Sequence, residues 1–226
     1  MIKKDTQGVT FAKGFTAAGV KAGIKKSGNL DVAVIYTKTQ AVVAGTFTQN
    51  KVAAAPVYVS KEVVATGTAH AIVANAGCAN ACTGQQGLDD AHKMAQIAAD
   101  ELGVNADDVI VGSTGVIGVN LPMDKLEAGI KDAVANLSAD GSDNAGRAII
   151  TTDTHSKSVT CEFELSGKTV RMGAIAKGSG MIRPNMATML CYITTDIAID
   201  QALLQKAVSG CVEKSFNMIS VDGDMS

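Results

Sequence analysis

The residue with the clearest chemical potential is Thr188, which follows Ala187 in the run Lys-Gly-Ser-Gly-Met-Ile-Arg-Pro-Asn-Met-Ala-Thr-Met-Leu at positions 177–190. A threonine hydroxyl in mid-chain has no base of its own to take its proton. A threonine at a chain terminus carries one, the free α-amine, whose ordinary pKa is about 7.7 to 8.0. Cleavage of the Ala187–Thr188 bond would therefore turn Thr188 into a nucleophile.

The surroundings of this bond suit self-cleavage, in which the Thr188 hydroxyl attacks the preceding carbonyl group. Ala187 is small, and loop-forming residues stand before it: Gly178, Gly180, Pro184 and Asn185. The apolar run at 189–193 predicts a buried strand that would hold Thr188 in place. The alternative is an ordinary threonine that opens a strand after a turn, because threonine favours strands.

A second candidate is the run Gly-Ser-Thr-Gly-Val-Ile-Gly at 112–118, which follows a short apolar strand at 109–111. Such a turn could hold phosphate on its backbone amides. However, its glycines do not match G-x-G-x-x-G, and the run 173–179 lacks the lysine of a Walker loop. The same residues could instead present the Gly115 amide and the Thr114 hydroxyl or amide to a developing oxyanion. A purely structural turn is the other interpretation.

Lys177 could meet a substrate carboxylate from its position ahead of Thr188, or it could be a solvated surface lysine. Asp222-Gly223-Asp224 could ligate a cation, although this pattern is also typical of a turn. The histidines and the closely spaced cysteines show no spacing of a metal site, so we expect no metal: His70, His92, His155, Cys78 and Cys82.

Composition narrows the class of protein. The chain has 226 residues, 46% of them hydrophobic, which is enough to bury a core. Its 20 basic and 22 acidic residues give no electrostatic footprint for nucleic acid, so the expected ligand is a small molecule. There is no signal-peptide pattern and no apolar run of about 20 residues. We therefore expect no membrane association and a cytoplasmic location. The five cysteines are odd in number and lie mostly among apolar residues, so we expect reduced thiols.

The pattern of elements predicts a mixed α+β chain with antiparallel strand pairs, not a doubly wound Rossmann sheet. Strands are expected at 31–37 and 40–47 as a hairpin turning at Lys38-Thr39, at 57–60, at 70–74, and at 158–165 and 168–176 as a second hairpin. Helices are expected at 89–102, after Pro122, and from an Asp200 cap to about 216, with Leu203, Leu204, Ala207 and Cys211 inward.

Taken together, the sequence resembles the glutamate N-acetyltransferase family, also called ornithine acetyltransferases. The resemblance rests on blocks in the family's order, at 75–84, 112–118, 151–154, 177–190 and 221–226. The block at 177–190 is close to diagnostic.

The resemblance implies a self-processing precursor that splits into α and β chains before Thr188 and assembles as an α2β2 heterotetramer. It implies acetyl transfer from N-acetylornithine to glutamate through an acetyl-threonine, without a cofactor, in arginine biosynthesis. Use of acetyl-CoA to make N-acetylglutamate is a further option. The family's oxyanion pair falls on Thr114 and Gly115, and its substrate contacts fall on Thr151, Lys177 and Thr188. The family fold is a layered α/β sandwich, which related self-processing aminopeptidases share.

Two departures from the family pattern stand out. Ser156-Lys157 replaces the usual proline and lysine after the threonine-aspartate-threonine block. The sequence also stops at Ser226, within a block that normally continues. We expect residues 1–187 to form the α-chain-like part and 188–226 to be the truncated start of the β chain, in one structural domain across the cleavage site. The alternatives are an uncleaved, inactive module that serves binding or assembly, and an aminopeptidase.

Overall fold

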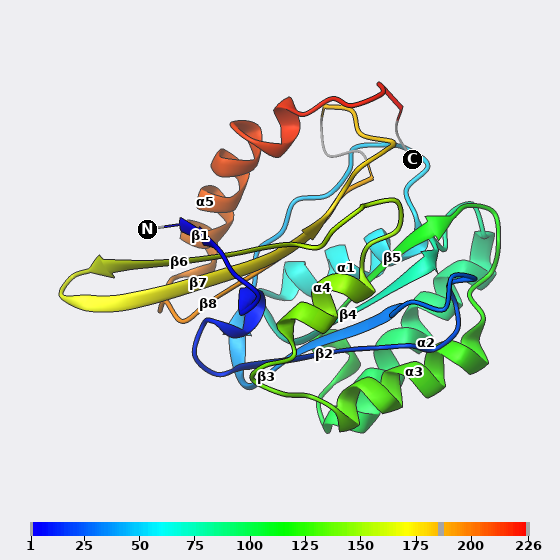
Figure 1. The fold of residues 1–226 in the computed structure, drawn as a ribbon, viewed down its shortest axis with the longest axis horizontal. Helices are drawn as coiled ribbons and strands as arrows, with labels where there is room; N and C mark the ends of the chain where they lie inside the picture. Colours follow the sequence, from blue (N-terminus) through cyan, green and yellow to red (C-terminus); the bar gives the residue numbers. More distant parts are fainter. Residues whose placement is uncertain (1, 185–187, 225–226) are drawn as a thin grey trace.

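The computed structural model describes residues 2–184 and 188–224 and contains two four-stranded sheets (Figure 1). The first sheet has the order β2-β3-β4-β5, with β2 (Phe15–Val20), β3 (Val32–Val42), β4 (Thr68–Cys78) and β5 (Val109–Val116). Its β2–β3 and β3–β4 pairs are antiparallel, and its β4–β5 pair is parallel. This one sheet therefore mixes both kinds of ladder.

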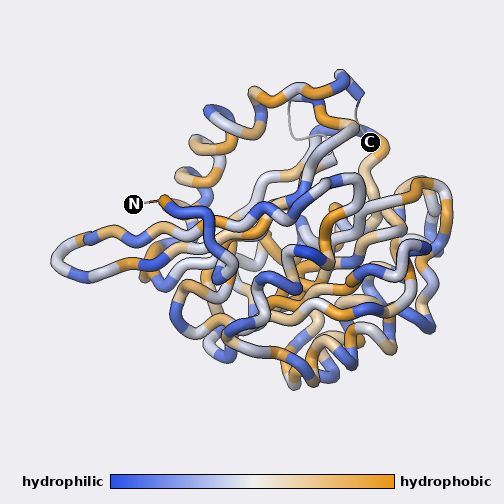
Figure 2. Tube along the Cα trace, in the orientation of Figure 1, coloured by the Kyte–Doolittle hydropathy of each residue, from blue (hydrophilic) through white to orange (hydrophobic). Residues whose placement is uncertain are grey.

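The second sheet is antiparallel throughout, in the order β1-β6-β7-β8. Its strands are β1 (Ile2–Lys4), β6 (Lys157–Leu165), β7 (Lys168–Lys177) and β8 (Leu190–Thr195). Ser166 and Gly167 join β6 to β7 with φ angles of 50° and 75°, as a two-residue hairpin turn requires. In Figure 2 this hairpin projects from the body with hydrophilic and hydrophobic residues mixed along it.

Helices α1 (Ala55–Thr66), α2 (Gly84–Leu102) and α3 (Met123–Ala135) share a hydrophobic core with the first sheet. A second core lies between the two sheets, where α4 (Ser142–Ala148) packs with Ile175 of β7 and Tyr192 of β8. Helix α5 (Gln201–Glu213) lies on the other side of the molecule from α2 and α3 (Figure 1). Short 3-10 helices lie at Gly8–Thr10, Ala106–Asp108 and Phe216–Met218. The expected class, a layered α+β sandwich and not a Rossmann sheet, is confirmed.

Several expected elements are confirmed. Helix α2 ends at Gly103, whose left-handed conformation caps it, and Pro122 stands directly before α3. Asp200 caps α5, because its side chain accepts hydrogen bonds from the backbone of Ala202 and Leu203. The second hairpin lies where the alternating residues and the Ser-Gly pair predict it.

Other expected elements are wrong. No turn occurs at Lys38-Thr39, because β3 runs through these residues and only its register to β4 shifts, between Tyr36 and Ala41. The expected strand at 57–60 belongs to α1, which has a proline in its first turn and Gly67 at its C-terminus. These helix signals outweigh the β-branched residues.

The inward face predicted for α5 is also wrong. Leu203 is 57% exposed, Ala207 and Cys211 are exposed, Leu204 is half-buried, and Val212 is the buried residue of the helix. Helical spacing identifies which face is apolar, but it does not identify what covers that face.

Candidate active site

The predicted site residues come from both sheets. Thr114 and Gly115 lie near the end of β5 in the first sheet, and Lys177 is the last residue of β7 in the second. Lys177 pairs with Leu190, which places the start of β8, and Thr188 just before it, beside the end of β7. The two sheets therefore bring residues far apart in the sequence to one place.

Lys177 connects the two halves of this site. Its side-chain amine donates to the hydroxyl oxygen of Thr114 at 3.2 Å and to the carbonyl oxygen of Thr188 at 3.4 Å. The residue is only 2% exposed, so the surface-lysine interpretation is wrong. Burial lowers the pKa of Lys177, although the negative charge of Asp153 acts in the opposite direction.

Thr114 and Gly115 belong to the strand and not to a turn, because β5 continues to Val116. The chain leaves the ladder only after that, with Gly118 at a φ of 78°. The β4–β5 register is irregular at Gly77 and Cys78, where Gly115 adopts a φ of 134°. A side chain is therefore excluded at Gly115 by its backbone conformation.

Thr188 has a φ of 61°, in the left-handed region. A β-branched residue is a genuine outlier there, with a cost of about 1–3 kcal/mol, and such strain clusters at functional sites. Ala187, the other half of the predicted cleavage bond, lies outside the described residues. The neighbouring thiol of Cys191 is no rival nucleophile, since burial raises its pKa to about 12.

Thr151 is exposed on the segment between α4 and β6. Within the described residues, no hydrogen bond joins its side chain to Thr114, Lys177 or Thr188. The residue of this block that reaches the site is Asp153, whose Oδ1 accepts from the backbone amide of Gly178 at 2.9 Å and from the Lys157 amine. Sequence reasoning missed Asp153, and its only signal was its place within the block 151–154.

Asp222 is a structural acceptor in this arrangement. Its carboxylate accepts from the backbone amides of Met181 at 2.7 Å, Ile182 at 3.1 Å and Asp224 at 3.1 Å. Val221 adds a backbone bond to the carbonyl oxygen of Ile182. The turn interpretation therefore describes residues 222–224, and they anchor the segment that leads toward Thr188. No cluster of three potential metal-ligating side chains exists in the part of the chain that the structure describes.

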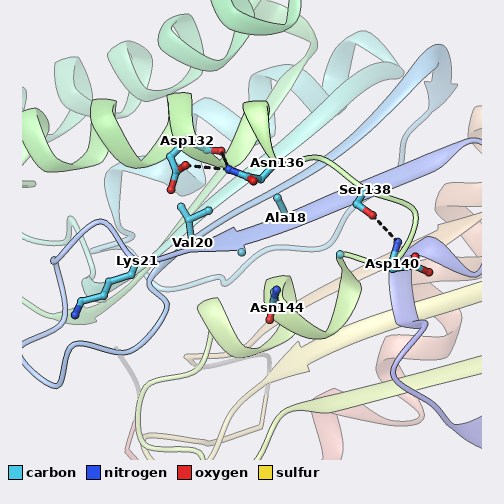
Figure 3. A pocket seen from close by; sticks show the side chains of 10 residues that line it. Ala18, Val20, Lys21, Asp132, Asn136, Ser138, Asp140 and Asn144 are labelled. Carbon is cyan, nitrogen blue, oxygen red and sulfur yellow. Dashed lines mark hydrogen bonds between the residues drawn. The ribbon is translucent and has the colours of Figure 1, made fainter.

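A small pocket of about 160 Å³ opens beside Lys177, with Ile182, Met189, Phe216 and Val221 among its lining residues. A larger cavity of about 460 Å³ lies elsewhere, against β2 and between the end of α3 and α4 (Figure 3). None of the predicted site residues lines that cavity. Two of its polar residues are already paired, since Asn136 donates to Asp132. The chemistry therefore points to the smaller pocket. Among the helices in the described ranges, none is long and apolar enough to cross a membrane.

The family comparison covers nearly the whole chain. A model described as the ArgJ family matches residues 16–226. The arginine biosynthesis bifunctional protein ArgJ of Symbiobacterium thermophilum is 51% identical over 97% of this chain and 55% of its own length. The chain thus spans about half the length of the curated relatives it matches.

Solved structures agree with this likeness. The ornithine acetyltransferase of Mycobacterium tuberculosis, complexed with ornithine, is 42% identical with a TM-score of 0.76, over 84% of this chain and 100% of that chain. The L-aminopeptidase D-Ala-esterase/amidase of Ochrobactrum anthropi is 12% identical with a TM-score of 0.56, over 99% of this chain and 70% of that chain. This second likeness concerns the fold alone. The match over residues 16–226, with half of the aligned residues identical to a relative, shows that the chain belongs to the ArgJ family.

Proposed function

We propose that this chain cleaves itself between Ala187 and Thr188, and that Thr188 then transfers acetyl groups from N-acetylornithine to glutamate. The observation that carries the proposal is the contact of Lys177 with both the Thr114 hydroxyl and the Thr188 carbonyl group. It brings the candidate nucleophile, cation and oxyanion donor together.

The cleavage step requires no added group except water. The Thr188 hydroxyl oxygen bonds to the carbonyl carbon of Ala187, the Ala187–Thr188 C–N bond breaks, and the nitrogen takes a proton. The result is an ester, which water hydrolyses to a carboxylate on Ala187 and a free Thr188 hydroxyl. Relief of the left-handed Thr188 conformation favours this step, because the strain belongs to the intact chain.

The transfer step uses the same atoms. The Thr188 hydroxyl, with its α-amine as general base, attacks the acetyl carbonyl of N-acetylornithine, and the C–N bond to ornithine breaks. The amine of glutamate then attacks the acetyl-threonine ester, which releases N-acetylglutamate and restores the hydroxyl. The Thr114 hydroxyl accepts a hydrogen bond from the Lys177 ammonium, which leaves its own proton to donate to the oxyanion beside the Gly115 amide.

Substrate binding is assigned to the pocket beside Lys177. Lys177 is one of the residues that line this pocket, and its ammonium is the proposed partner of a substrate carboxylate. Thr151 completes the proposed substrate contacts with Lys177 and Thr188. No cofactor is required, because a hydroxyl, a general base and oxyanion donors are sufficient for acyl transfer.

Two comparisons support these proposals. The relatives are named as arginine biosynthesis bifunctional proteins, and the Mycobacterium protein is named an ornithine acetyltransferase. The Mycobacterium chain matches 84% of this chain and is itself fully covered. That share is close to the part that precedes Thr188, which is 187 of 226 residues. We infer an α-chain-like part at 1–187 and a β-chain start at 188–226, within one structural domain.

We place the mature protein in the cytoplasm as an α2β2 heterotetramer, without nucleic-acid or membrane partners. Acetyl-CoA is a second proposed acetyl donor for glutamate. Direct assay of each donor, with peptide hydrolysis measured in parallel, separates the acetyltransferase from a self-processing aminopeptidase.

Denaturing electrophoresis with amino-terminal sequencing tests the cleavage. We expect a second chain that begins Thr-Met-Leu-Cys-Tyr, and an acetylated Thr188 peptide after incubation with N-acetylornithine. Thr188→Ala should remain one chain, whereas Thr188→Ser keeps the hydroxyl and should still cleave. A wild-type chain that stays intact after long incubation, or acetylation of Thr188→Ala at this site, would contradict the proposal and favour the uncleaved binding module.

A further inference from the structure

Asp153 is a buried carboxylate at the junction between the segment 149–156 and the end of β7. Its side chain is 0% exposed, and its Oδ1 accepts hydrogen bonds from the Lys157 amine and from the Gly178 amide. The other oxygen, Oδ2, is buried and has no hydrogen-bond partner in the described part of the chain. A buried charge with a spare acceptor is costly, so a compensating cation is needed nearby.

The bond to Gly178 fixes the backbone at the residue that follows Lys177. Lys177 also ends the β7–β8 ladder, so this bond holds the point where the chain leaves the sheet on its way toward Thr188. The Lys177 amine contacts Thr114 at 3.2 Å and Thr188 at 3.4 Å, so the position of its backbone bears on both contacts.

Asp153 also acts on Lys177 through charge. The charged groups that act on the Lys177 amine are Asp153, which favours the ammonium, and Lys157, which opposes it. Asp153 itself faces three amines, those of Lys157, Lys177 and Lys25, which come from β6, β7 and the segment before β3. Burial acts to raise the pKa of Asp153, but the hydrogen bonds from Lys157 and from the Gly178 amide, together with the charges of Lys157 and Lys177, lower it.

We propose that Asp153 is a positioning residue for the reaction at Thr188: it fixes the end of β7 through Gly178 and supplies the negative charge that balances the buried Lys177 ammonium. The role of that ammonium in catalysis rests on the proposed function. The link between Asp153 and Lys177 does not, and it can be measured in a chain that neither cleaves nor transfers acetyl groups.

The test is a titration of Lys177 by carbon NMR in the full chain, labelled at the lysine ε-carbon and assigned with Lys177→Met. In Asp153→Asn the pKa of Lys177 should fall by about 1 unit or more relative to the wild type, since an opposite charge nearby shifts a pKa by about 1–3 units. Amide exchange at Gly178 should accelerate in the same variant. Asp108→Asn is the matched control, because Asp108 and Asp153 are each 8% exposed as whole residues and both are hydrogen-bonded, but Asp108 is not among the charged groups that act on Lys177.

The reciprocal experiment covers the case in which Asp153→Asn does not fold. Removal of the cation in Lys177→Met should raise the pKa of the Asp153 carboxyl group, followed by NMR of the labelled carboxyl carbon. An unchanged Lys177 titration in folded Asp153→Asn, or an unchanged Asp153 titration in Lys177→Met, would overturn the proposal. Failure of wild-type cleavage with these shifts present would contradict only the proposed function. Loss of cleavage in Asp153→Asn, with recovery in Asp153→Glu, would support the positioning role.

Discussion

Gly115 lies so close to Gly77 across the β4–β5 ladder that a Cβ atom on Gly115 would stand 2.4 Å from the carbonyl carbon of Gly77. The obstacle is backbone, which cannot move aside as the end of a side chain can. Together with the φ of 134° at Gly115, this contact means that the strand end can approach its neighbour only as glycine. The candidate oxyanion donor is thus placed by packing and not by a flexible turn.

Gly115→Ala is expected to destabilise the chain by more than about 1–3 kcal/mol, because backbone strain and a steric clash add. Gly210→Ala is the matched control, since Gly210 in α5 has open space around the position of its Cβ. Gly210→Ala should stabilise the chain by about 0.5–1 kcal/mol, because alanine has a higher helix propensity than glycine. Urea unfolding measures both, and equal effects of the two substitutions would refute the packing argument.

Gly112 is also restricted by a close neighbour, which here is the side chain of Tyr192. A Cβ on Gly112 would lie 2.2 Å from the Tyr192 hydroxyl oxygen, which is buried and has no hydrogen-bond partner among the described residues. Burial also raises the pKa of Tyr192, so the hydroxyl stays neutral. Tyr192→Phe should therefore be neutral or stabilising by about 1 kcal/mol.

A double-mutant cycle tests this pair. Gly112→Ala alone should be destabilising by about 1–3 kcal/mol, and the cost should shrink when Tyr192→Phe removes the hydroxyl. The two effects are measured by urea unfolding of the single and double variants. Additive effects would show that the hydroxyl group is not the obstacle.

Thr114→Val should slow the appearance of the new amino terminus by about 10²–10³-fold, the usual loss for one oxyanion donor. The substitution keeps the shape of the side chain but removes the hydroxyl that Lys177 contacts. Thr114→Ser keeps the hydroxyl and should retain most of the rate. Sequencing of timed samples gives the cleavage rates, and similar rates for the two variants would exclude the hydroxyl as the donor.

Acid should weaken the hydrogen bonds by which Asp222 holds the backbone amides of Met181 and Ile182. Backbone hydrogen bonds, first that of Met181, lower the pKa of this carboxyl group in the folded chain. The stability that the ionised carboxyl group contributes is therefore fully present above its unfolded-state pKa of about 3.9. It is lost as the pH falls through the lower pKa of the folded chain. Amide exchange at Met181 and Ile182, corrected for intrinsic rates, should show protection at neutral pH that disappears in strong acid.

Asp222→Asn should lower this protection already at neutral pH, because an amide oxygen is a weaker acceptor than a carboxylate. Asp224→Asn is the control, since Asp224 contributes its backbone amide to the arrangement and should keep it. Loss of protection in Asp224→Asn but not in Asp222→Asn would contradict this account.

The sequence predicts those elements whose signals are local. Asp200 before α5, Gly103 after α2 and the Ser166-Gly167 turn each have a side-chain or backbone reason that acts within a few residues. The strand expected at 57–60 fails because its β-branched residues also suit the buried face of a helix, where Val59 and Val63 pack. The choice between these structures depends on partners far away in the chain.

The sequence also predicts part of the candidate site, namely the residues but not the contacts between them. Thr188, Thr114 and Lys177 were identifiable by type and by their blocks, but nothing in the spacing predicts that a buried amine joins the other two. That contact depends on how the two sheets pack. Asp153 was missed for the same reason, because its partners Lys157 and Gly178 come together only when β6 and β7 pair.

The ladder between β7 and β8 would hold the two chains together after cleavage. Six register pairs, from Met172 with Thr195 to Lys177 with Leu190, join the strand before the cleavage bond to the strand after it. Breaking the Ala187–Thr188 bond would cut the connection between β7 and β8 but leave the hydrogen-bonded ladder between them intact. The new chain end would then remain beside Lys177 as a tethered reactant, and the two products would separate only if the sheet itself came apart.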